Sequence, residues 1–330
     1  MITAGAAVLA SAAAALANPV FINIGYQAQA TAVSTDGTVV VGVQSGSIFR
    51  WTQATGMTLL GAGTEPRVSA DGSAMAWQGS GNVYRWTALQ GAVVIGAAAA
   101  SSATISGDGS TVAWGNQRWS TAGWSTTLQP PAGTAQPRVT ALSFDGSIAV
   151  GSTNTFIPSR WDGAGVGVSL GSIPGYPVEG SAGAVSPDGQ TVLGSSSGSP
   201  LYDLFRWRQD VGMVGVHAGL AGPTVYGATT DGAIAIGMAN SAQAFVWREG
   251  FGSALLNGLL HNRYGINIPS IDLEYAKGIS GDGRTVVGYG WDYSVNKPMA
   301  WVVQLDSSIP APGTAAAFAV LSAFGMRRRR

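Results

Sequence analysis

The sequence contains no cysteine, only two histidines and few charged residues. Without cysteine the chain has no disulfide, no thiolate metal site and no cysteine nucleophile. His217 and His261 are too few for a multi-histidine metal site, and they leave almost no candidates for a Ser-His-Asp triad. Charged residues make up 10% of the chain and the formal net charge is zero. Nucleic acid is therefore not an expected partner, because phosphate binding needs clustered Lys and Arg.

Glycine, in contrast, is abundant, with 48 of 330 residues. That is about twice the usual frequency of roughly 7%, and it suits a chain that turns tightly every ten residues or so. The glycines lie where hairpins are expected, and none forms a glycine-rich phosphate loop ahead of a helix. No cofactor is expected.

Seven turns of the form Ser-x-Asp-Gly recur along the chain, the sixth with threonine in place of serine. Successive turns are 35, 37, 37, 43, 43 and 51 residues apart, which is the range of solenoids and propellers. The turn aspartates are Asp36, Asp71, Asp108, Asp145, Asp188, Asp231 and Asp282. A tryptophan follows each turn, and these are Trp51, Trp86, Trp119, Trp161, Trp207, Trp247 and Trp301.

Each repeat predicts four short β-strands. In the first repeat, residues 38–42, 48–51 and 57–61 form runs that are rich in β-branched, aromatic or aliphatic residues and bounded by turn formers. Such runs are too short for a helical stripe and are typical of strands. Four antiparallel strands per repeat make one propeller blade. The chain is therefore predicted to be all-β and to fold as a seven-bladed β-propeller over residues 18–306.

The two ends of this domain predict how the ring closes. The seventh repeat stops after three strands, whereas residues 21–25 precede the first turn and resemble a fourth strand. We expect this N-terminal strand to complete the last blade, because a closed ring leaves no exposed sheet edge. Unpaired residues 21–25, or a stacked solenoid, would contradict this prediction.

The Ser-x-Asp-Gly turn has a structural and a functional interpretation. The Asp and Ser side chains can hydrogen-bond nearby amides while Gly takes positive φ, which suits a hairpin turn. A ring of seven carboxylates on one propeller face could instead bind Ca²⁺ or cationic ligands. Neighbouring blades would hold the carboxylates too far apart to share one ion, and Ca²⁺ needs six to eight close oxygens. The turn interpretation is favoured, and no metal site is expected.

The side chains around the repeated tryptophans favour a structural role. Aromatic-x-Trp pairs such as Phe49 and Trp51 share one face of a strand, so they predict core between blades rather than a binding platform. In the third repeat, Trp124 competes with Trp119 for this position. An arginine precedes the tryptophan in five repeats, which suggests an ion pair with the repeated Asp or stacking on an aromatic ring. These arginines are Arg50, Arg85, Arg118, Arg160 and Arg206.

Residues 1–17 have the pattern of a secretory signal peptide. An apolar, alanine-rich run ends in Ala15-Leu16-Ala17, the small-x-small pattern at which a signal peptidase cuts. The positive region that normally begins such a peptide is absent, so the start could be truncated. A buried or disordered alanine-rich N-terminus is the alternative.

Residues 307–330 resemble the bacterial PEP-CTERM sorting signal. A Pro-Ala-Pro-Gly motif precedes an apolar stretch, 314–326, and a tetra-arginine end. In that family an exosortase-type enzyme recognises the tail, which serves as a transient membrane anchor. Ala311 replaces the glutamate expected in the motif, and a plain C-terminal anchor is the alternative, although about 20 residues are needed to span the hydrocarbon. The residues that carry the resemblance are Pro310, Pro312, Gly313, Arg327, Arg328, Arg329 and Arg330.

The repeats also resemble bacterial extracellular repeats of the HAF type, whose unit contains Ala-x-x-Val-Ser-x-Asp-Gly followed by Ala-Phe-x-Trp. The closest copies span residues 32–60, 182–207 and 276–301. The resemblance implies an exported surface protein and supplies no catalytic residues. The implied partners are the export machinery and a sorting enzyme, and the expected form is a monomer.

The longest departure from the repeat predicts where a function would reside, because a site must differ from its scaffold. Residues 256–275 form the longest insertion, and Asp292 follows in the seventh blade. Asp272, Glu274 and Asp292 could bind a sugar chain or, as a carboxylate pair, cleave a glycan as a hydrolase or lyase. A loop of solvated polar residues is the alternative. We favour a non-catalytic protein that binds polysaccharide, matrix or another surface protein.

Overall fold

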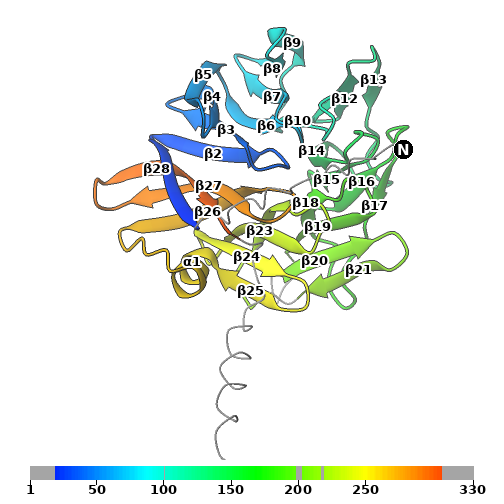
Figure 1. The fold of residues 1–330 in the computed structure, drawn as a ribbon. Helices are drawn as coiled ribbons and strands as arrows, with labels where there is room; N and C mark the ends of the chain where they lie inside the picture. The colour runs from blue at the N-terminus through cyan, green and yellow to red at the C-terminus, as the bar shows by residue number, and fades with distance from the viewer. Residues whose placement is uncertain (1–18, 100, 198–202, 217–218, 307–330) are drawn as a thin grey trace, which may run out of the picture.

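A computed structural model describes residues 19–306, except for residues 100, 198–202 and 217–218. The described chain forms seven four-stranded antiparallel sheets and one helix. Figure 1 shows the sheets arranged in chain order around one axis, so that blue strands of the first sheet lie beside orange strands of the last. The predicted seven-bladed β-propeller is confirmed.

The four strands of each blade follow one another from the innermost strand to the outermost. The first three blades are β2 (Ala28–Val33), β3 (Val39–Gln44), β4 (Ser47–Thr52) and β5 (Gly56–Ala62); β6 (Thr64–Val68), β7 (Ala74–Gly79), β8 (Asn82–Thr87) and β9 (Gly91–Ala97); β10 (Thr104–Ile105), β11 (Thr111–Trp114), β12 (Gln117–Ser120) and β13 (Ser125–Thr127). The next three are β14 (Pro137–Leu142), β15 (Ala149–Thr153), β16 (Pro158–Trp161) and β17 (Gly167–Ser169); β18 (Gly180–Val185), β19 (Thr191–Ser196), β20 (Asp203–Arg208) and β21 (Gly212–Val216); β22 (Thr224–Ala228), β23 (Ile234–Ala239), β24 (Gln243–Arg248) and β25 (Gly252–Leu255).

The seventh blade joins the two ends of the domain. It consists of β26 (Ile271–Ile279), β27 (Thr285–Asp292), β28 (Lys297–Gln304) and the N-terminal strand β1 (Val20–Tyr26). β1 pairs antiparallel with β28, with Val20 opposite Gln304. This pairing closes the ring as predicted and excludes the stacked solenoid.

The hydrophobic core lies between the blades. Seven clusters of buried side chains occupy the seven junctions, and the cluster between blades one and seven joins Val40 and Phe49 to Val287. The repeated tryptophans all lie on the third strand of a blade, and Trp161 and Trp301 are completely buried. In the third blade this position belongs to Trp119, whereas Trp124 is exposed beyond the strand.

The Ser-x-Asp-Gly turns connect the first two strands of each blade, and all seven use the same hydrogen bonds. In the first turn the Gly37 amide donates to Ser34 O at 2.9 Å, and the Ser34 hydroxyl donates to Asp36 and accepts from the Val39 amide. Asp36 also accepts from the Thr38 amide at 3.0 Å. Each aspartate therefore forms hydrogen bonds within its own turn.

Neighbouring turns are also joined to one another around the axis. The Thr35 amide donates to Ala70 O, and the Gly281 amide donates to Thr35 O, at 2.8 Å each. Equivalent backbone bonds join six of the seven junctions. The seventh, between blades five and six, has Pro187 at the donor position, and proline has no amide hydrogen. These bonds hold the turns together on one face of the propeller.

The repeated arginines cross from one blade to the next. Arg85 Nε donates to Gly109 O, the carbonyl of the next blade's turn, at 3.0 Å. The Arg160 guanidinium lies 5.9 Å from the ring centroid of Trp207 in the next blade. The sequence thus correctly suggested stacking on aromatic rings.

The suggested ion pair with the repeated aspartate is wrong. Among the described residues, none of the five arginines pairs with a turn aspartate, because the turn presents its glycine carbonyl to the arginine and keeps the carboxylate for its own donors. Arg206 instead forms an ion pair with Glu249, which follows β24 in the next blade.

The insertion between blades six and seven is not a polar loop. It begins with the helix α1 (Leu256–Tyr264), whose Leu256 and Leu260 are buried in the core cluster of these two blades. The helix ends at Gly265, which takes φ 66°, a conformation that glycine adopts without strain. Within the described ranges the chain has no helix with the length and apolarity needed to cross a membrane.

Candidate functional site

A central cavity of about 630 Å³ lies within the ring of blades. Its walls come mainly from the first halves of the innermost strands and from the ends of their neighbours, so it lies toward the face opposite the Asp-Gly turns. Cavities that bind small molecules are typically of this size. No residue of the largest insertion, 256–275, lines this cavity, and none of the predicted carboxylates does.

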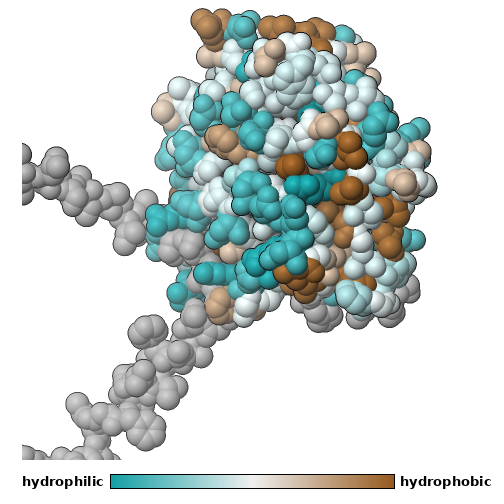
Figure 2. All heavy atoms as spheres, turned by 90° about the vertical axis from the view of Figure 1, so that its right-hand side faces the viewer, coloured by the Kyte–Doolittle hydropathy of each residue, from teal (hydrophilic) through white to brown (hydrophobic). Residues whose placement is uncertain are grey.

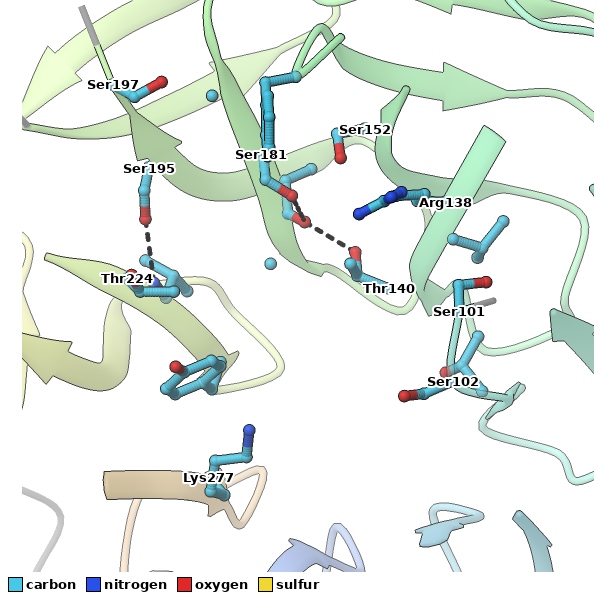
Figure 3. A pocket seen from close by; sticks show the side chains of 18 of the residues that line it. Ser101, Ser102, Arg138, Thr140, Ser152, Ser181, Ser195, Ser197, Thr224 and Lys277 are labelled. Atoms are coloured by element: carbon cyan, nitrogen blue, oxygen red, sulfur yellow. Dashed lines mark hydrogen bonds between the residues drawn. The ribbon is translucent and has the colours of Figure 1, made fainter. Parts of the chain in front are cut away.

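Hydroxyl groups dominate the polar lining of the cavity, and several are aimed at its centre (Figure 3). The Thr140 hydroxyl donates to Ala182 O at 2.7 Å, and Ser195 Oγ accepts from the Val225 amide at 3.0 Å. Each hydroxyl can both donate and accept, so such walls suit a hydroxylated ligand. The lining hydroxyls are Ser101, Ser102, Thr104, Thr140, Ser152, Ser181, Ser195, Ser196, Ser197 and Thr224.

One repeat position controls what the innermost strands present to the axis. It lies three residues before the Ser or Thr of each turn, and in five blades it is the extra residue of a β-bulge. A bulge re-aims the side chain of its extra residue. From blade one to blade seven the position carries Thr31, Pro66, Ala103, Thr140, Gly183, Tyr226 and Lys277.

Both threonines at this position bond to the next blade, and Thr140 also lines the cavity, whereas the last two residues line the cavity without such a bond. Thr31 Oγ1 donates to Pro66 O of the next blade at 2.7 Å, as Thr140 does to its own neighbour. Tyr226 and Lys277 make no such bond and face the cavity instead. The Lys277 Nζ lies 3.8 Å from the centroid of the Tyr226 ring, a cation–π contact.

Charged groups on blades two and seven interact across the cavity. Burial and, to a smaller extent, the nearby Arg67 charge lower the pKa of Lys277 to about 8, although Glu65 acts in the opposite direction. Burial by itself would raise the pKa of Glu65, but a hydrogen bond from Ser102 and the charges of Lys277 and Arg67 hold it below its usual value. Arg67 Nη1 is anchored to Thr31 O at 2.8 Å.

A row of three tyrosines extends from the cavity wall into blade seven. Tyr275 stacks on Tyr289 with ring centroids 4.5 Å apart, and Tyr226 lies 6.5 Å from Tyr275. Burial raises the pKa of Tyr226 and of Tyr289, with Tyr275 adding to both effects. These phenols are neutral at physiological pH and can present ring faces and hydroxyls.

The predicted acids lie on blade seven but do not converge. Asp272 is exposed and accepts a hydrogen bond from Tyr293 at 3.1 Å. Asp292 is buried and accepts from Tyr26 at 2.9 Å and from Ser294. Asp272 lies opposite Trp291 in the sheet, and Asp292 lies opposite the residue before Asp272, so the two aspartates project from opposite faces of the sheet.

Glu274 is the acid with the more unusual environment. It is the extra residue of a second bulge in β26 and is half-buried. Burial raises the pKa of Glu274, and the charge of Asp272 raises it further. Glu274 thus combines a raised pKa with a neighbouring carboxyl group, an arrangement that general acids also use, but it lies outside the cavity.

The remaining predicted residues are the turn aspartates and the residues at the two ends of the chain. The Ser186 hydroxyl and the Gln190 amide lower the pKa of Asp188, and similar hydrogen bonds lower it at four other turn aspartates. In the described ranges no three His, Cys, Asp or Glu side chains are grouped to hold a metal. The predicted signal peptide, the Pro-Ala-Pro-Gly motif and the four terminal arginines lie outside the described residues.

Sequence reasoning missed Lys277 and Tyr226, although a signal was present. Aligning the repeats on their turns places a threonine or a small residue or proline at this position in five units, and a long polar or aromatic side chain in the last two. The chain has only two lysines, and one of them is here. The insertion departs from the repeat in length, whereas the cavity wall departs from it by substitution of residues at one position.

Outside the central cavity, the described part of the chain has smaller hollows of about 400 and 460 Å³. Exposed valines are spread over several outermost strands, for example Val168 on β17 and Val214 on β21, with an adjacent pair, Val93 and Val94, on β9. Figure 2 shows hydrophobic areas on this side of the molecule broken up by polar ones. Scattered exposed apolar residues are normal on a soluble surface, so the cavity remains the best candidate site.

Comparisons with known proteins support the fold. No family model and no curated protein matches the chain. Among solved structures, the β-propeller domain of Cps50 (Swd1) from Myceliophteria thermophila matches with a TM-score of 0.58 and 12% sequence identity. The match covers 86% of this chain and 98% of that domain. At this identity the likeness shows a β-propeller and nothing about its ligand.

Proposed function

We propose that this chain is an exported, cell-surface-associated propeller that binds polysaccharide without catalysing a reaction. The observation that carries the proposal is the central cavity, whose hydroxyl-rich walls and volume of about 630 Å³ suit one or two sugar units of a glycan. The Tyr226 ring adds an apolar face beside these hydroxyls. A second surface protein that uses the same face is the alternative partner.

The positions of the first and last strands are compatible with proteolytic cleavage at both ends of the chain. The strands occupy residues 20–304, so cleavage after Ala17 and removal of residues 307–330 would leave every blade intact. Val20 lies opposite Gln304, and the leader and the tail therefore adjoin the same blade. In this proposal the export machinery removes the leader, and an exosortase-type enzyme acts on the tail after a transient stay in the membrane.

Mass spectrometry of the protein from its own cells tests this part. The expected mature protein begins at Asn18 and ends upstream of the four terminal arginines. A protein that retains both ends would contradict processing, and fractionation into cytoplasm would contradict export. Sedimentation of the same material should give a monomer.

Titration calorimetry with the exopolysaccharide of those cells tests binding. Ser181 lines the cavity, and Ser181→Tyr should fill part of it and weaken binding at least tenfold. Ser125→Tyr, on the exposed outermost strand of blade three, is the matched control and should bind normally. Equal binding by both variants would place the ligand elsewhere.

A glycan hydrolase or lyase remains the second candidate, because Glu274 has its pKa raised by burial and by Asp272. The test is release of reducing ends from the same polysaccharide. Release that disappears in Asp272→Ala or Glu274→Ala, but persists in the control Asp210→Ala, would establish catalysis and overturn the binding-only proposal. Asp210 lies in an exposed turn between β20 and β21.

A further inference from the structure

Lys277 is a largely buried cation for which the described residues provide no hydrogen-bond acceptor. Its exposed fraction is 8%, and its ammonium lies over the Tyr226 ring at the cavity wall. No hydrogen bond or ion pair joins this ammonium to any residue in the described ranges 19–99, 101–197, 203–216 and 219–306. The ammonium is not among the fully buried unsatisfied atoms, so it is accessible from the cavity. A cation held at a cavity wall without a hydrogen-bond acceptor can bind an anionic ligand.

The cavity as a whole carries excess positive charge. Its lining includes Lys277, Arg67 and Arg138 but only one carboxylate, Glu65. Glu65 cannot neutralise all three cations. Figure 3 shows Lys277 and Arg138 pointing into the same space from opposite walls, blades seven and four. The space between them therefore favours an anionic ligand.

The contacts of Glu65 indicate that the hydroxyls and cations of the cavity can bind a carboxylate. Its carboxylate accepts a hydrogen bond from the Ser102 hydroxyl and is stabilised by the charges of Lys277 and Arg67, with the result that its pKa falls. The same combination of hydroxyls and cations can hold a second carboxylate deeper in the cavity. Charge-assisted hydrogen bonds of this kind are about twice as strong as neutral ones.

We propose that the cavity selects acidic saccharides, and that the Lys277 ammonium binds the carboxylate of a uronic acid unit while the serine and threonine hydroxyls bind its ring hydroxyls. This inference rests on the proposed function, since it specifies the glycan that the same cavity takes. Arg138 completes the charge from the opposite wall, and Tyr226 fixes the position of the ammonium.

The test compares the binding of an acidic saccharide with the binding of its neutral, carboxyl-reduced form. The full-length protein is titrated at neutral pH and 0.15 M salt with oligogalacturonate and with the same oligosaccharide after its carboxyl groups are reduced to alcohols. The acidic form should bind at least tenfold more tightly. In Lys277→Met, which keeps a stem of similar length, that preference should fall to about twofold or less, whereas the exposed-lysine control Lys297→Met should keep it.

Each other result overturns a defined part of the proposals. Equal binding of both saccharides, or a preference that survives in Lys277→Met, overturns the acidic-sugar inference and leaves the glycan-binding function standing. Binding of neither saccharide overturns this inference, and failure with the native exopolysaccharide as well would overturn the proposed function. Competition by sulfate at the same concentration as the uronate would identify a simple anion site and also overturn it. Arg138→Met should also reduce the preference for the acidic saccharide.

Discussion

Replacement of Lys277 by methionine should make the protein more stable at neutral pH, although it removes the charge that we assign to ligand binding. The folded protein lowers the pKa of Lys277 from 10.5 to about 8, mainly through burial and then through Arg67. The folded state therefore holds the proton less tightly than the unfolded chain does. A charged Lys277 at pH 7 therefore lowers the free energy of unfolding by the amount that corresponds to this difference in pKa.

The size of this effect follows from the two pKa values. At about 1.4 kcal/mol for each factor of ten in protonation, the charge costs about 3 kcal/mol at pH 7. Methionine keeps the apolar stem but loses the cation–π contact with Tyr226, which is worth about 1 kcal/mol. The free energy of unfolding of Lys277→Met should therefore exceed that of the wild type by about 2 kcal/mol.

The same values give a pH dependence of definite sign. Between about pH 8 and pH 10 the unfolded chain keeps the Lys277 proton, which the folded protein has released. Wild-type stability should accordingly rise with pH in this range, by about 2 kcal/mol from pH 7 to 9.5. The variant should lack this rise. Above pH 10, tyrosines such as Tyr289, whose pKa burial raises, lower the stability of both proteins.

Urea unfolding monitored by tryptophan fluorescence, at pH 7 and pH 9.5, measures both quantities. Lys297→Met, which removes the exposed lysine, should follow the wild type at both pH values. A Lys277→Met protein that is less stable than the wild type at pH 7 would refute the reasoning. It would mean that the lysine is paired within the folded protein and contributes to stability.

Three further predictions concern the scaffold. Ser280→Ala should lower the free energy of unfolding by about 2 kcal/mol, because it removes a buried hydroxyl that bridges its turn and leaves a backbone amide without an acceptor; Ser125→Ala, at an exposed site, should have no effect. Arg85→Met should cost about 1 kcal/mol by breaking the bond to Gly109, and equal urea midpoints would contradict this. Five turn aspartates have lowered pKa values because the hydrogen bonds of the turn outweigh burial, and these are Asp36, Asp71, Asp145, Asp188 and Asp231. They stabilise the fold above about pH 4, and thermal unfolding should shift downward as pH falls below this value. An unchanged melting temperature between pH 5 and pH 3 would contradict a stabilising role for these carboxylates.

The number of blades could be predicted from the sequence because the fold is a local pattern repeated. The side-chain hydrogen bonds of each Ser-x-Asp-Gly turn lie within six residues. The turn can therefore form independently of the rest of the chain. The tryptophan on the third strand follows each turn aspartate by 11 to 19 residues. Ring closure by β1 could also be predicted, because a missing strand at one end matched a spare strand at the other.

The helix α1 could not be predicted in this way. Its sequence contains Gly258 and lacks a side-chain cap at Leu255, so local propensity alone does not favour a helix. Leu256 and Leu260 are buried against blades six and seven, and this tertiary packing stabilises the helix. The arginine contacts likewise depend on which carbonyl of the next blade lies within reach.

The sequence by itself determined the repeat, the turns, the count of seven blades and the absence of cysteine chemistry. These properties depend on residues close together in the chain. Only the tertiary structure decided where a ligand could bind, because the cavity forms from six innermost strands that are distant in sequence. The ring brings Lys277, Arg67 and Arg138 around one space, and it separates Asp272 from Asp292, which a reading along the chain had grouped together.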